Sequence, residues 1–313
     1  MSVHIKREWY KEETPVKEYE YSFALIGDTQ MLSMLDADTG TASKAASDIP
    51  NEWIGQSLMK TLYGWIADNK DSKKIAHAFI LGDITENIAV EAEWKTARKA
   101  ISLIDGRVDF SAVRGNHDHP QNYNDMIDRL EYKNTVEGFY EPKRWRNAYR
   151  RFEVGGVKYL SLMLDHGVPD EIIEWADGII SQFSDHKVIV STHTYIDQKG
   201  DFITHESNGR ATPIKNDGVA IWEKLLSKHK NVFMVFCGHC GVWGGYSSSV
   251  VVGDHGNRVI NVMTDPEVID LHGDFPGAMV LMLYFSKDGS SVDLRYYSTA
   301  RNEFYGTGET ILL

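Results

Sequence analysis

Asp, Asn, Gln and His residues recur in five short loops of this sequence, and each loop follows a run of apolar residues. The loops read GDTQ (27–30), GDITEN (82–87), GNHD (115–118), STHT (191–194) and CGHC (237–240). Carboxylate oxygen, amide oxygen and imidazole nitrogen are the usual ligand atoms of divalent metal ions. The loops therefore predict a metal site, and the polar residues placed there are Asp28, Gln30, Asp83, Asn116, His117, His193 and His239.

The loop CGHC contains both cysteines of the chain, Cys237 and Cys240, and admits other chemistry. A reactive thiolate of a CxxC motif is stabilised at the start of a helix. The sequence that follows, GVWGGYSSSVVV, disfavours a helix because of its glycines and β-branched residues. A dithiol oxidoreductase is therefore a remote alternative. A structural zinc site would need further ligands, and the chain has no other cysteine.

The apolar runs that precede the polar loops predict buried strands. They cover residues 21–30, 76–87, 108–118, 157–167, 186–194 and 231–240. Helical periodicity appears between them, for example over 58–66 and 172–180, and this alternation is typical of an α/β fold. Ligands of α/β proteins collect beyond the carboxyl ends of the strands, so we expect the polar loops to lie close together.

The remaining segments suggest one domain, residues 21–313, preceded by an N-terminal arm of residues 1–20. Residues 119–152 are aromatic and basic and interrupt the alternation, so we interpret them as a cap insertion over the mouth of the site. Residues 247–313 contain short β-type runs with glycine turns, which predict a C-terminal extension of a sheet.

The composition is that of a globular protein, with 42% hydrophobic and 25% charged residues in 313. No apolar stretch is long enough to span a membrane, so no membrane association is expected. Two cysteines suit a reducing compartment, and we expect a cytoplasmic protein; a trimmed secretory signal would leave the same picture. The net charge of −12 disfavours a nucleic-acid polymer as partner.

In order and spacing, the five loops resemble those of the calcineurin-like metallophosphoesterase superfamily. The usual forms there are Asp-x-His, Gly-Asp-x-x-Asp, Gly-Asn-His-Asp/Glu, a lone His and Gly-His-x-His. The resemblance runs from about residue 21 to residue 241 and extends to a bacterial branch with Asp-Thr-Gln in the first loop. It implies a four-layer α-β-β-α sandwich with two mixed β-sheets.

The resemblance also implies metal-dependent hydrolysis of a phosphate ester. Asp83 would bridge two divalent metal ions, drawn from Mn, Fe, Mg and Zn, and a hydroxide between them would attack phosphorus. Asp28 and Gln30 would bind the first ion. The second ion would be bound by Asn116, His193 and His239.

Four further residues have implied or candidate roles around the metals. His117 would be the general acid for the leaving oxygen, and Glu86 would orient it. Asp118 is a second candidate for that supporting role. Arg114, which precedes the GNHD loop, is a candidate for binding phosphate oxygens, because its planar fork suits them.

The sequence departs from the family pattern at two ligands of the first metal. Gln30 stands where histidine is usual, and Gly241 replaces the second histidine of Gly-His-x-His. The first site should therefore be the weaker one and should prefer Mn, Mg or Fe(II) to Zn. Our hypothesis is that His255 or Asp254, in a nearby turn, supplies the missing ligand.

The substrate is left open between two kinds of ester. A phosphomonoesterase acting on a phosphorylated small molecule or a phosphoprotein competes with a phosphodiesterase acting on a small molecule. The departures at Gln30 and Gly241 keep a non-catalytic metal-binding or ligand-binding module as the alternative from another class. The oligomeric state is also left open.

Overall fold

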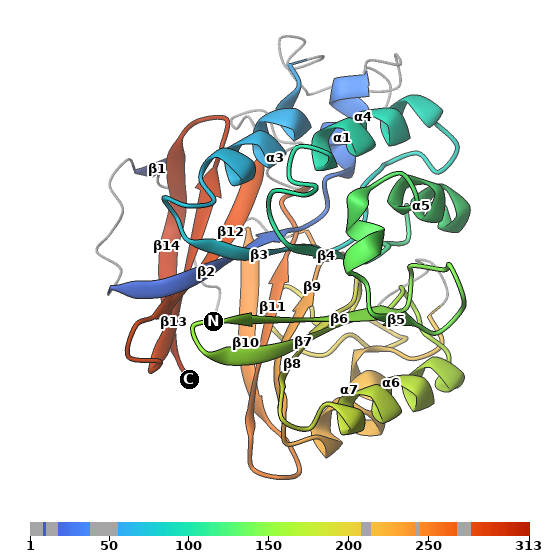
Figure 1. The fold of residues 1–313 in the computed structure, drawn as a ribbon, viewed down its shortest axis with the longest axis vertical. Helices are drawn as coiled ribbons and strands as arrows, with labels where there is room; N and C mark the ends of the chain where they lie inside the picture. Colours follow the sequence, from blue (N-terminus) through green and yellow to red (C-terminus); the bar gives the residue numbers. More distant parts are fainter. Residues whose placement is uncertain (1–8, 11–17, 38–55, 208–213, 242–244, 268–276) are drawn as a thin grey trace.

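Two β-sheets packed face to face form the centre of the molecule (Figure 1). The structure is a computed structural model that describes residues 9–10, 18–37, 56–207, 214–241, 245–267 and 277–313. Within these residues each sheet has seven strands. Both sheets are mixed, because each contains parallel and antiparallel neighbours.

The first sheet contains the three strands that precede the first three polar loops. These strands run parallel to one another: β2 (Tyr19–Ile26), β3 (Ile75–Ile80) and β4 (Phe110–Ala112). Antiparallel strands continue the sheet beyond β2. In spatial order they are β12 (Met279–Ser286), β13 (Ser291–Ser298), β14 (Glu303–Leu312) and β1 (Trp9–Tyr10).

The second sheet has four neighbouring parallel strands. They are β7 (Val157–Met163), β8 (Lys187–Ser191), β9 (Val232–Cys237) and β11 (Arg258–Thr264). Antiparallel strands complete both sides of this group. They are β10 (Tyr246–Val252) beside β11, and β6 (Ala148–Val154) followed by β5 (Gly138–Phe139) beside β7.

Helices cover the outer face of each sheet and complete four layers, as the sequence predicts (Figure 1). Over the first sheet lie α1 (Gln30–Ala37), α3 (Leu58–Asp68), α4 (Glu91–Ile101), α5 (Pro120–Ile127) and the 3₁₀ helix η2 (Glu131–Thr135). Over the second lie α6 (Asp170–Gln182), α7 (Gly218–Lys224) and η3 (Leu226–Lys228).

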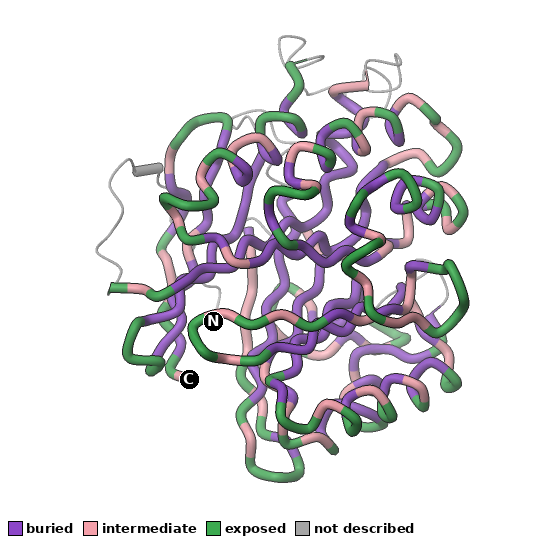
Figure 2. Tube along the Cα trace, in the orientation of Figure 1, coloured by how far each residue is buried: buried purple, intermediate pink, exposed green. Residues whose placement is uncertain are grey.

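Side-chain alternation along the strands divides the core between layers. On β2, Phe23 and Leu25 pack between the two sheets, whereas Ala24 and Ile26 pack against the helices. This period of two is the geometry of a pleated strand with both faces covered. Figure 2 shows the buried residues concentrated along these central strands.

The segments that were predicted to lie outside the strand–helix alternation contribute strands to both sheets. Residues 119–152 form α5, η2, β5 and the first part of β6. Residues 247–313 include most of β10 and β11 in the second sheet and β12 to β14 in the first. Only part of the predicted N-terminal arm is described, and its residues 9–10 pair with β14. No helix within the described residues combines the length and apolar character needed to cross a membrane.

Candidate metal centre

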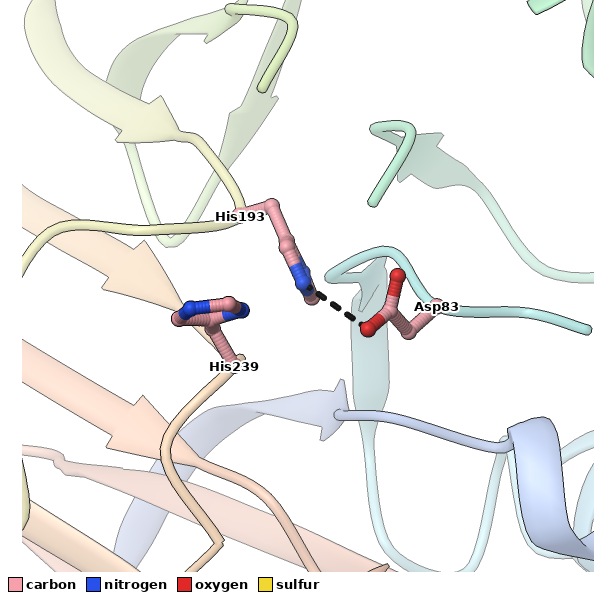
Figure 3. Close-up of side chains that lie close together, drawn as sticks. All are labelled: Asp83, His193 and His239. Atoms are coloured by element: carbon pink, nitrogen blue, oxygen red, sulfur yellow. Dashed lines mark ion pairs between the residues drawn. The ribbon is translucent and has the colours of Figure 1, made fainter. Parts of the chain in front are cut away.

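The side chains of Asp83, His193 and His239 lie close together beyond the carboxyl ends of parallel strands from both sheets (Figure 3). One ligand atom from each lies within 4.8 Å of the others, and Asp83 Oδ2 is 3.1 Å from His193 Nε2. The three residues follow β3, β8 and β9, so both sheets contribute. One carboxylate and two imidazoles are suitable ligands for a divalent transition metal.

Hydrogen bonds orient the ring of His193, which is fully buried. Its Nδ1 lies 2.8 Å from the carbonyl oxygen of Leu81, and because a carbonyl can only accept, Nδ1 carries a proton. Nε2 therefore faces the site, 3.0 Å from Asn116 Oδ1. Burial disfavours the charged ring, but the carboxylate of Asp83 outweighs this effect and raises the pKa of His193.

The other two members of the cluster have the charge states that metal binding requires. Burial would raise the pKa of Asp83, yet the neighbouring His193 lowers it to about 2. Burial, together with the charge of His193, lowers the pKa of His239 to about 4. At neutral pH, Asp83 is thus a carboxylate and His239 a neutral imidazole, the forms that bind a cation.

Asp28 joins the cluster from the first loop and is fully buried. Its carboxylate accepts the backbone N–H of His239 at 3.1 and 3.2 Å, and its Oδ1 lies 3.9 Å from His193 Nε2. Burial raises the pKa of Asp28 well above its ordinary value, and repulsion from Asp265 and Asp83 raises it further. Three buried carboxylates that repel one another define a place for positive charge.

The backbone of three candidate ligands is left-handed, which is uncommon outside glycine. The φ angles are 22° at Asp28, 45° at Asp83 and 79° at His239. Strained conformations of this kind cluster at functional sites. Two neighbouring glycines leave no room for a Cβ unless these carboxylates move: a Cβ on Gly115 would lie 2.0 Å from Asp83 Oδ1, and one on Gly238 would lie 2.2 Å from Asp28 Oδ2.

Gln30 is the first residue of α1 and lies beyond the end of β2. It therefore belongs to a helix and is not an extension of the strand that ends before Asp28. Its side chain is nonetheless buried, with 2% exposed, and its Oε1 has no hydrogen-bond partner among the described residues. A buried acceptor without a partner is costly, and a bound cation would satisfy it.

His117 lies beside the cluster and is linked to both Asp83 and Glu86. Its backbone N–H donates to Asp83 Oδ1 at 2.8 Å. Its Nδ1 lies 3.2 Å from Glu86 Oε2 and 3.1 Å from the carbonyl oxygen of Glu86. The contact with Glu86 is the main reason that the pKa of His117 rises to about 10. The ring is protonated at neutral pH and is partly exposed.

Asp118 is bonded to backbone groups, which differs from its predicted role beside His117. Its carboxylate accepts the N–H groups of Ile84, Thr85 and Gly115 at 2.9 to 3.1 Å. These bonds tie the loop after β3 to the loop after β4. Asp118 therefore holds two ligand loops in position.

Arg114 is likewise committed to the protein, in contrast to the predicted contact with phosphate. It donates to Asp165 Oδ1 at 2.7 Å and to the carbonyl oxygens of Gly115 and Asp118 at 2.8 and 2.9 Å. Its side chain is largely buried. Arg114 therefore supports the loop that contains Asn116.

The structure does not bring Asp254 and His255 into the site. His255 Nε2 lies 3.0 Å from the carbonyl oxygen of Lys228, and the N–H of Asp254 donates to the carbonyl oxygen of Ser227. These contacts place the turn near the start of β9, whereas His239 follows its end. The two ends of β9 are about 20 Å apart, since a strand rises about 3.3 Å per residue.

Two residues outside the predicted set lie at the centre. Asp265 follows β11 and is fully buried, and its position directly after an apolar run is a signal that could have identified it. His166 is also buried, and its ring centroid lies 5.7 and 5.9 Å from those of His193 and His239. Its Nδ1 is 3.0 Å from Thr194 Oγ1. Burial, followed by the electrostatic effect of the neighbouring His193 and His239, lowers the pKa of His166 to about 3, so its ring is neutral.

Two packed mixed sheets with carboxylate, amide and imidazole groups converging at one edge define an α/β protein with a metal-binding centre. The model of the calcineurin-like phosphoesterase family matches residues 21–271, and the chain belongs to this family. The sequence is 26% identical over 238 residues to the uncharacterized protein YvnB of Bacillus subtilis. That match covers 73% of this chain but only 16% of the length of the relative.

Solved structures share the fold at low sequence identity. A dimetal phosphatase from Danio rerio superposes with a TM-score of 0.56 at 12% identity, covering 94% of this chain and 99% of that one. A purple acid phosphatase from yellow lupin seeds superposes with a TM-score of 0.54 at 14% identity, covering 93% of this chain and 53% of that one.

Proposed function

We propose that the protein is a metal-dependent phosphoesterase that hydrolyses a phosphate ester on a small molecule. The observation that carries the proposal is the convergence of Asp83, His193 and His239, from both sheets, within 4.8 Å of one another. Membership of the calcineurin-like phosphoesterase family supports the same reaction class.

We assign the candidate ligand atoms to two divalent cations. Asp28 and Gln30 would hold the first, Asn116, His193 and His239 the second, and Asp83 would be shared between them. When bound, the cations supply charge neutralisation for the phosphate and lower the pKa of a water molecule to make it a nucleophile. The positive charge would also relieve the repulsion among the buried carboxylates.

His117 would donate the proton that the leaving oxygen needs. Glu86 holds Nδ1 of its ring at 3.2 Å, so Nε2 is the atom that we assign to proton donation. The raised pKa of about 10 keeps the ring protonated at neutral pH. General acid catalysis of this kind contributes typically about 10² to 10⁴ in rate.

A hollow beside His117 supports a small substrate. It has a volume of about 520 Å³ and is lined by residues 86–90 together with Asn116 and His117. Pockets for small organic ligands range from about 300 to 1,000 Å³. Ile88, which is 48% exposed, offers an apolar surface for the organic part of the ester.

The proposal is tested with metal-depleted protein that is reconstituted with Mn²⁺ and assayed on chromogenic phosphate monoesters and diesters. The wild-type protein is expected to turn over the ester when metal is present. The variant Asp83→Asn is expected to lose turnover although it folds as the wild type does. Mutation of a residue that only supports a metal ligand typically lowers metal affinity or activity by about 10- to 100-fold. Loss of Asp83, which would be shared between both ions, should lower turnover by more than that. Absence of turnover with any metal and any ester would contradict the proposal.

A second candidate is a metal-binding module without catalysis. The observation that favours it is Gly241, which offers no side chain where the family pattern has a histidine ligand. This candidate predicts metal binding without hydrolysis, so the same reconstituted protein distinguishes the two functions.

A further inference from the structure

Asp265 occupies a position level with His239 on the neighbouring strand. Strands β11 and β9 are parallel, and their last paired residues are Met263 and Cys237. Asp265 and His239 each lie two residues beyond that pair. The residue after β11 therefore emerges at the same edge of the second sheet as a candidate metal ligand.

The first loop of the other sheet approaches Asp265 closely. A Cβ built on Gly27 would lie 1.8 Å from the carbonyl oxygen of Thr264 and 3.3 Å from the backbone nitrogen of Asp265. Gly27 and Thr264 are the residues immediately before Asp28 and Asp265. Because Gly27 has no side chain, the backbones that precede Asp28 and Asp265 can lie in contact.

The carboxylate of Asp265 is only half satisfied. Its Oδ1 accepts the N–H of Glu267 at 2.9 Å. Its Oδ2 is buried and has no hydrogen-bond partner among the described residues. A buried acceptor oxygen without a partner is costly, and a bound cation would satisfy it.

No lysine or arginine of the described chain forms an ion pair with the three neighbouring carboxylates Asp28, Asp83 and Asp265. The charge that balances them would come from bound cations. An additional oxygen ligand is also what the first metal needs, because Gly241 provides no side chain.

We propose that Asp265, through Oδ2, is a ligand of the first divalent cation and takes the place of the imidazole that is missing at Gly241. The first site then consists of the oxygens of Asp28, Gln30, Asp83 and Asp265. Hard oxygen ligands favour Mn²⁺ or Mg²⁺, whereas the imidazoles of the second site favour later transition metals. This inference rests on the metal centre of the proposed function.

The experiment measures metal stoichiometry and affinity on the metal-depleted full chain by titration with Mn²⁺, read by calorimetry and by elemental analysis after dialysis. Wild-type protein is expected to bind two equivalents. Asp265→Asn and Asp265→Ala are expected to weaken one of the two by about 10- to 100-fold or more, with the other unchanged. Asp254→Asn is the matched control, since Asp254 flanks the other end of β11 and is exposed.

A gain-of-preference variant keeps the test independent of stability. Asp265→His is expected to retain two equivalents and to raise the affinity of the weaker site for Zn²⁺ relative to Mn²⁺. Two unchanged Mn²⁺ affinities in folded Asp265→Ala would overturn the assignment, even if the wild-type protein hydrolyses esters. Two metal ions in the wild type, one in Asp265→Ala and no hydrolysis in either would uphold Asp265 and reject the phosphoesterase.

Discussion

Asp83 and His193 lie on different sheets, yet Asp83 Oδ2 is 3.1 Å from His193 Nε2. Asp83 follows β3 of the first sheet, and His193 follows β8 of the second. The core between the sheets, which contains Phe79 and Ile189, fixes how the two strands face each other. Packing between the layers therefore sets the geometry of the metal centre, and changes on either side should be felt there.

Replacing His117 tests general acid catalysis. His117→Asn should lower kcat by about 10² to 10⁴ on esters with a poor leaving group, and far less on a nitrophenyl ester that leaves without a proton. Metal content should stay unchanged. Glu86→Gln should give a smaller loss with the same dependence on the leaving group, since Glu86 acts through the ring. Equal losses on both esters would argue against the acid role.

Gly238 tests the close packing around Asp28. In Gly238→Ala the new Cβ would lie 2.2 Å from Asp28 Oδ2, so the carboxylate must move. We expect at least a tenfold loss of metal affinity, measured by titration calorimetry. Gly178→Ala is the control, because nothing lies within 4 Å of that Cβ on helix α6. This control should bind metal normally and gain about 0.5 to 1 kcal/mol of stability. Unchanged affinity in Gly238→Ala would show that Asp28 can shift freely.

The burial of His77 predicts that the protein loses stability at mildly acidic pH. Its ring is fully buried, is stacked on Phe152 at 4.2 Å between centroids and contacts Ser111 Oγ at 2.9 Å. Burial, assisted by the positive charge of Arg150, lowers the pKa of His77 well below its ordinary value of 6.5. The unfolded chain thus binds a proton that the folded chain does not, so stability falls as the pH falls below about 6.5.

Denaturant unfolding at several pH values measures this contribution. Between pH 6.5 and 5, the wild-type free energy of unfolding should fall more steeply than that of His77→Gln, by up to about 1.4 kcal/mol per pH unit. The variant itself should be less stable at pH 8 because it loses the stacked ring. Parallel pH profiles for the two proteins would refute the assignment to His77.

The two cysteines should be dispensable for activity. Cys237 packs in the core between the second sheet and its helices, and Cys240 packs against the same core. Burial raises the pKa of Cys237 and raises that of Cys240 to about 12, so neither is a thiolate at neutral pH. The double variant Cys237→Ala, Cys240→Ala should keep its turnover, and thiol reagents should leave the wild type active. A loss of turnover at unchanged fold and metal content would reopen the dithiol alternative.

The sequence predicted the sheets and the loops well because both depend on local pattern. The six apolar runs correspond to β2, β3, β4, β7, β8 and β9. The faces of α3 and α6 that periodicity selects are buried, for example Leu62 and Ile173. The rule that ligands collect beyond the carboxyl ends of parallel strands places Asp28 and Asp83 at one edge of the first sheet and His193 and His239 at one edge of the second. Which way the two sheets face each other depends on their packing.

The predictions for Asp254, His255 and Arg114 depended on contacts that are not local. Whether a turn lies near the metals depends on the direction of the next strand, and β11 runs parallel to β9, so the turn before it lies at the opposite edge. Asp265, at the other end of β11, reaches the centre instead. The partner of Arg114 is Asp165, about fifty residues away in sequence and visible only after folding.

Because the candidate ligands belong to both sheets, any cation held between them would also join the layers. The free energy of cation binding would then add to that of folding, by RT ln(1 + [L]/Kd) for each ion at free concentration [L]. The melting temperature would then rise with the free concentration of the cation. Without metal, the layers would be held together by the remaining contacts between the sheets, among them the aromatic and aliphatic packing around Phe23 and Phe79 and the hydrogen bond between Tyr21 and Tyr159.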